Sequence, residues 1–78
     1  MAQYFFDIIA DGKLSPDEEG MVLPSIDAAR REASRSLADL ARDIIRTAHP
    51  PKLTISVRNS EGPVFEANFQ WGLEVAKH

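Results

Sequence analysis

The sequence predicts an α+β fold: a four-stranded antiparallel sheet with one long helix packed on one face. Two observations support this prediction. Short segments rich in aromatic and β-branched residues, two of them with strict alternation, are typical of strands, and one long segment has apolar residues at spacings of three and four. The predicted order is β-β-α-β-β. A length of 78 residues fits one small domain, spanning 1–78.

The first half of this pattern contains two strands separated by turns. Tyr4–Ile9 reads Y-F-F-D-I-I, which predicts a strand with neighbours on both sides. The Asp11-Gly12 pair predicts a turn, and Ser15–Asp17 predicts a second one, because proline presets the backbone angle of a type I turn. Met21–Leu23 is then expected to form a short second strand.

The helix is predicted from Ser25 to Thr47. Pro24 stops strand pairing, Ser25 can cap the helix N-terminus, and Asp27 places a negative charge in the first turn. His49-Pro50-Pro51 ends the segment. The apolar stripe of an amphipathic helix consists of Ile26, Ala29, Ala33, Leu37, Leu40, Ala41 and Ile44.

Two further strands follow the double proline. Leu53–Arg58 and Val64–Val75 alternate apolar and polar residues, and Asn59–Gly62 between them predicts a hairpin turn. If the third strand pairs with the first, the spatial order is 2-1-3-4, with the helix as a right-handed crossover.

Alternation separates the predicted core from an open sheet face. On the open face Phe5 and Ile9 are apolar exceptions among polar side chains, and we interpret them as a possible partner contact. The predicted core consists of Tyr4, Phe6, Ile8, Leu37, Leu40, Ile44, Ile55, Val57, Phe65, Phe69 and Trp71.

Composition excludes several classes of protein. Cysteine is absent, which excludes disulfides and thiolate chemistry and fits a reducing cytoplasm. The N-terminal apolar run ends at Asp7, too early for a signal peptide or a membrane span, so no membrane contact is expected. A net charge of −3 argues against a dedicated polyanion binder. No cofactor is expected.

Several spaced motifs together resemble one family. They are Y-F-F-D-I at Tyr4–Ile8, D-G at Asp11, D-E-E-G at Asp17–Gly20, L-P at Leu23, and A-A-R-R-E-A at Ala28–Ala33. This combination is similar to a family of short bacterial domains of unknown function. The resemblance implies a small stand-alone cytoplasmic protein, and it implies no activity, cofactor or functional residue. The strand and helix order alone is also similar to the antitoxin halves of some bacterial toxin-antitoxin pairs.

The acidic loop from Asp11 to Glu19 is a candidate metal or ligand site, because its carboxylates are hard oxygen ligands. Its spacing does not match a helix-loop-helix calcium site, which needs glycine at the sixth position, where Pro16 stands. The alternative is turn chemistry: Asp17 accepts a backbone N–H two residues on, Glu18 is solvated, and Gly20 supplies a positive φ angle.

No constellation of catalytic residues is apparent. His49 and His78 have no nucleophile placed near them by sequence, and no serine lies in a glycine-flanked elbow. The sequence therefore predicts that the protein is not an enzyme.

The helix carries a row of arginines opposite its apolar face: Arg31, Arg35, Arg42 and Arg46. Such a row can contact phosphates or an acidic protein surface. Acidic residues lie among the arginines, and pairs such as Asp27 with Arg31 or Arg35 with Asp39 match the i,i+4 spacing of helix ion pairs. A solvated, salt-bridged helix face is the alternative.

These features favour a small non-enzymatic protein-binding or regulatory module that uses Arg31, Arg35, Arg42 and Arg46 or Phe5 and Ile9. A nucleic-acid-associated, antitoxin-like regulator and a metal- or ligand-binding protein are the alternatives. A homodimer is possible where the last strand, around Trp71-Gly72, overhangs its predicted partner.

Overall fold

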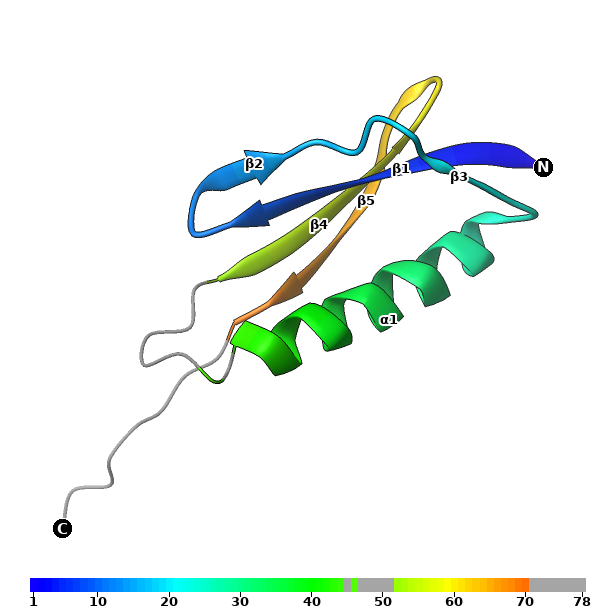
Figure 1. Cartoon of the computed structure of the whole chain (residues 1–78). Helices are drawn as coiled ribbons and strands as arrows, with labels where there is room; N and C mark the ends of the chain where they lie inside the picture. Colours follow the sequence, from blue (N-terminus) through cyan, green and yellow to red (C-terminus); the bar gives the residue numbers. More distant parts are fainter. Residues whose placement is uncertain (45, 47–51, 71–78) are drawn as a thin grey trace, which may run out of the picture.

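The computed structural model describes residues 1–44, 46 and 52–70. It contains one helix and five strands, and the helix lies across one face of the sheet (Figure 1). The elements in chain order are β1 (Ala2–Ala10), β2 (Lys13–Ser15), β3 (Met21–Leu23), α1 (Ile26–Ile44), β4 (Leu53–Asn59) and β5 (Gly62–Phe69). The α+β class is therefore confirmed.

All strand pairs are antiparallel, and the main order in the sheet is β2-β1-β4-β5. β3 pairs with the first part of β1, outside this order. The three predicted neighbour pairs are present, because β1 pairs with β3 and with β4, and β4 pairs with β5. The predicted count of four strands is wrong, since β2 adds a fifth strand beside β1.

β2 was missed because its three residues are all exposed and show no apolar alternation. It exists because the predicted turn before it is a tight one. Asp11 and Gly12 have φ angles of 53° and 78°, the two positive values that a two-residue hairpin turn of the I′ type requires. The turn sends Lys13–Ser15 back along β1, where Leu14 lies opposite Ile9.

The helix begins as predicted. The Ser25 hydroxyl accepts a hydrogen bond from the Ala28 N–H at 3.1 Å, and the Ser25 carbonyl accepts one from the Ala29 N–H. α1 ends at Ile44, and Arg46 lies in a turn, so the helix stops before the predicted end at Thr47, which itself lies outside the described residues.

The last strand begins at Gly62, two residues before its predicted start at Val64. β5 ends at Phe69, and Trp71 to Val75 lie outside the described residues. The pairing with β4 shifts register after Val57, where Val64 is inserted between the partners of Val57 and Arg58. In the hairpin turn the Asn59 side-chain oxygen accepts the Glu61 N–H at 2.8 Å.

The core lies between α1 and β4. Ala29 and Ala33 are fully buried, and these small side chains allow the helix to approach the sheet closely. Tyr4, Ile55 and Val57 complete the buried cluster. Of the other predicted core residues, Phe6, Ile8, Leu37, Leu40 and Phe65 are only partly buried against this cluster, Ile44 and Phe69 are half-buried, and Trp71 is outside the described residues.

Candidate functional site

Residues 16–20 form the loop that joins β2 to β3 and passes the middle of β1 (Figure 1). Its central residue is Asp17, whose Oδ1 accepts hydrogen bonds from the backbone N–H groups of Glu19 and Gly20, both at 3.1 Å. Asp17 Oδ2 accepts the Phe6 N–H at 3.1 Å. One carboxylate thus fixes the loop and also occupies a backbone donor of β1 that no strand pairs with.

A second carboxylate and a guanidinium extend this arrangement. The Asp17 N–H donates to Asp7 Oδ1 at 2.8 Å, and Arg58 Nε donates to Asp7 Oδ2 at 2.8 Å. Arg58 Nη2 donates to the Asp17 carbonyl at 3.0 Å, and the guanidinium lies over the Phe5 ring, 4.4 Å from its centroid. We call Phe5, Asp7, Asp17, Gly20 and Arg58 the Asp17 cluster.

Gly20 completes the Asp17 cluster because an added side chain would crowd β1 and force a shift there. Its φ is 73°, and an added Cβ would lie 2.9 Å from Phe5 Cε1 and 3.0 Å from the Tyr4 carbonyl oxygen. The loop therefore approaches β1 as closely as backbone allows. Gln3 Nε2 lies beside the same position, 3.0 Å from an added Cβ, and donates to the Glu19 carbonyl at 2.7 Å.

Both carboxylates of the Asp17 cluster favour the charged form. Hydrogen bonds from Arg58 hold the pKa of Asp7 below its ordinary value, against the opposing effect of burial. For Asp17, burial alone would raise the pKa, but the N–H groups of Gly20, Phe6 and Glu19 together lower it. A general acid needs a raised pKa, so neither carboxyl group is tuned for that role.

The turn interpretation of the acidic loop is confirmed in each of its parts. Asp17 accepts the N–H of Glu19, Glu18 is exposed, and Gly20 has a positive φ. In the described part of the chain, no group of three or more His, Cys, Asp or Glu side chains is placed to hold a metal ion. Asp11, at the other end of the predicted acidic site, is exposed in the β1-β2 turn.

The sheet face opposite α1, which we call the open face, has none of the described elements over it (Figure 1). Cross-strand partners share a face, so the pairs Ile9-Leu14 and Gln3-Val22 place Leu14 and Val22 on the same side as Phe5. Leu14 is 61% exposed and Val22 58%. Phe5 and Ile9 are half-buried, and the Asp7-Arg58 ion pair lies between the two apolar ends.

The predicted contact residues therefore lie on opposite layers of the molecule. Phe5 and Ile9 are on the open face, whereas Arg31, Arg35 and Arg42 are exposed on α1 and Arg46 in the turn after it. One flat partner surface cannot contact both groups at once.

The predicted i,i+4 ion pairs of the helix are replaced by i,i+3 pairs. Arg35 binds Glu32 through both carboxylate oxygens, Arg42 lies 3.6 Å from Asp39, and Arg30 lies 3.7 Å from Asp27. In each pair the acid stands three residues before the arginine. Arg35 and Arg42, two of the four arginines in the row opposite the apolar face, are thus paired within the helix.

The link between Asp7 and Arg58, which are 51 residues apart, was not predicted from the sequence. A signal was available, because the predicted pairing of the first and third strands puts an acid and a base on the same face. What the sequence does not show is the register, which sets Phe5 opposite Arg58 and leaves Asp7 diagonally beside it.

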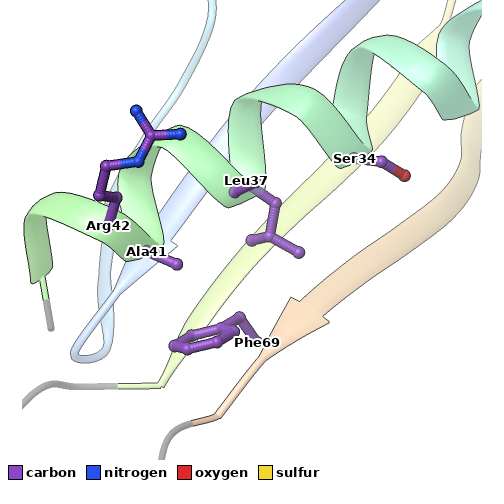
Figure 2. A pocket seen from close by; sticks show the side chains of 6 residues that line it. Ser34, Leu37, Ala41, Arg42 and Phe69 are labelled. Atoms are coloured by element: carbon purple, nitrogen blue, oxygen red, sulfur yellow. The ribbon is translucent and has the colours of Figure 1, made fainter.

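A pocket of about 490 Å³ lies between α1 and the end of β5, and its lining is mostly apolar. In Figure 2, Leu37 from α1 and Phe69 from β5 face one another across it, and the Arg42 guanidinium is directed away from Phe69. The sequence pattern predicts core positions for Leu37 and Phe69 and does not indicate this pocket. The lining residues are Ser34, Leu37, Ala38, Ala41, Arg42 and Phe69.

These features define a small α+β domain whose sheet has a helix on one face and an acidic loop fixed to one edge. The chain matches the model of the family described as Domain of unknown function (DUF6894) over residues 3–70, and it belongs to this family. Residues 3–70 contain the whole Asp17 cluster. The resemblance to a family of short domains of unknown function is thereby confirmed.

Comparison with curated proteins gives no match, and comparison with solved structures gives none. α1, the single helix of the described chain, is not long and apolar enough to cross a membrane.

Proposed function

We propose that this chain is a small non-enzymatic module that binds another protein through its open face. The observation that supports this most is the exposure of Leu14 and Val22, at 61% and 58%, on the same face as Phe5 and Ile9. Exposed apolar side chains on a sheet face that no described element covers are a typical contact surface for a partner.

The Asp17 cluster suits this role because it fixes the surface rather than reacting. Asp7 pairs with Arg58, and Asp17 accepts three backbone N–H groups, so a partner that covers them does not bury a charge without hydrogen-bond partners. The hydrogen bonds to Asp17 hold the loop against β1, and Arg58 holds the Phe5 ring. A rigid surface loses little conformational entropy on binding.

The test is affinity capture of the tagged full chain from lysate of its source cells, followed by measurement of direct binding with the purified partner. Leu14→Ser and Val22→Ser are expected to weaken binding about tenfold each, since each removes a buried apolar contact. Ile26→Ser is the matched control, because Ile26 is also an exposed apolar residue but lies at the start of α1. Equal effects of all three substitutions would contradict the proposal.

The nucleic-acid alternative rests only on the row of four arginines opposite the apolar face. Because Arg35 and Arg42 already pair with acids of the same helix, this row offers less unpaired positive charge than the sequence suggests. Any such binding would weaken steeply with salt, which a titration at two salt concentrations would reveal.

A further inference from the structure

We propose that the outer edge of β5, together with the pocket beside α1, binds an extended segment of another protein in which apolar and basic side chains alternate. This site lies at the β5 edge, away from Leu14 of β2 and Val22 of β3, and it does not depend on the proposed function. Three observations carry the proposal: an edge strand that no described residue covers, an apolar pocket beside that edge, and an exposed acid in the middle of the strand.

The two ends of the sheet differ in how their edges are protected. β2 has three residues, includes Lys13 and runs into the loop that Asp17 fixes, all features that discourage a further strand. β5 has eight residues and, in the part of the chain that the structure describes, pairs only with β4. Its outer row of backbone N–H and C=O groups is therefore available to an added strand.

An added strand would direct every second side chain toward the pocket. Along β5, Phe65 and Ala67 pack toward the core under α1, and Phe69 faces Leu37 across the cavity (Figure 2). A neighbouring strand shares this alternation, so its apolar side chains point to the same layer. The cavity of about 490 Å³ has room for a large apolar side chain, and Ala38 at its border is small and exposed.

The negative charge of Glu66, on the side of β5 that faces away from α1, favours a basic segment. Glu66 is exposed, its cross-strand partner is the neutral Ser56, and it takes part in no ion pair among the described residues. A basic side chain opposite Glu66 would stabilise the pairing.

The same charge disfavours a second copy of this chain. In a two-fold antiparallel pairing centred on β5, the two Glu66 side chains lie on one face, directly opposite or diagonally adjacent, and repel each other. The occupant that the charges favour is therefore a different, basic segment.

The test uses a ten-residue peptide of alternating lysine and valine, acetylated and amidated at its ends, titrated into the isotopically labelled full chain. Amide signals of Val64–Phe69 are expected to shift, and their hydrogen exchange to slow. Glu66→Lys should weaken binding about five- to tenfold, whereas Glu61→Lys, the same charge change in the exposed hairpin turn, should alter it less than about twofold. Ala38→Phe should weaken binding by filling the pocket, and Ala28→Phe, elsewhere on α1, should not.

Two control peptides test the alternation and the charge. One has the same lysines and valines in two blocks, and the other has glutamate in place of lysine; either one binding as tightly as the probe would overturn the proposal. Amide shifts confined to Leu14 and Val22 would also overturn the proposal. Self-association through β5 that Glu66→Lys does not change would overturn it as well. Because Leu14→Ser and Val22→Ser should leave peptide binding unchanged, failure of this site and failure of the open face are distinguishable. Circular dichroism of each variant confirms folding.

Discussion

Replacing Asp17 with asparagine tests whether the acidic loop is a structural element. The carboxylate accepts three N–H groups, two at Oδ1 and one, from Phe6, at Oδ2. The asparagine amide has one oxygen, and its NH₂ group would meet the remaining N–H donor or donors. At least one backbone donor is left unpaired, and the others lose a charged acceptor, so we expect a loss of about 2 kcal/mol in the free energy of unfolding.

This loss is measurable by urea denaturation followed by far-ultraviolet circular dichroism. For a small protein the free energy falls by about 1 kcal/mol per molar urea, so the midpoint should drop by about 2 M. Glu18→Gln is the matched control, because Glu18 is the adjacent acid but is exposed, and its midpoint should stay within about 0.5 M.

The pH dependence of the Asp17→Asn effect provides a second test. Because the pKa of Asp17 is lowered in the folded protein, its charged form contributes stability above the ordinary value of 3.8, and this contribution is lost as the pH falls through the lowered pKa. The difference between wild type and Asp17→Asn should therefore shrink on acidification. Equal midpoints of Asp17→Asn and Glu18→Gln at neutral pH would refute the structural role.

Three further predictions concern the Asp17 cluster. Gly20→Ala should lower the free energy of unfolding by about 1–2 kcal/mol more than Gly12→Ala. Both glycines have positive φ, but only at Gly20 would a Cβ contact the neighbouring strand. Equal costs of the two substitutions would show that the loop can move away from β1 without loss of stability. Arg58→Lys keeps the positive charge but loses the planar guanidinium that donates to both Asp7 and the Asp17 carbonyl, so the free energy of unfolding should fall by about 1 kcal/mol. The pKa of Asp7 should rise toward its ordinary value, which NMR titration of the carboxyl group would measure. An unchanged pKa would contradict the role of Arg58. The lowered pKa values of Asp7 and Asp17 predict a flat stability profile from pH 7 to about 5 and a decline as the pH falls through 3.8, whereas urea midpoints constant down to pH 3 would disagree.

The elements that the sequence predicts well are those with a local pattern. The stripe of α1, the Ser25 cap and the alternation of β4 are each encoded within a few neighbouring residues. β2 could not be predicted in this way, since Lys13–Ser15 buries no side chain and is stabilised by backbone pairing with β1.

The same contrast holds for the candidate site. The hydrogen bond from Glu19 to Asp17 is local, and turn chemistry predicts it. The bonds of Arg58 to Asp7 and Asp17 depend on the register between β1 and β4, which becomes known only when the strands are in place. The pocket likewise arises where α1 passes over Phe69, a position that no sequence period specifies.

The difference between the two edges of the sheet limits how copies of this protein can assemble. A sheet that is open at both edges can add strands at each end and propagate into a fibre. Here the β2 edge is short and continues into a loop whose Asp17 carboxylate occupies the Phe6 N–H, whereas the β5 edge is long. Whatever strand joins β5, the far side of the molecule offers little for the next addition. Among the described strands, only one edge is therefore suited to a further strand, an arrangement that disfavours growth by edge pairing beyond one step.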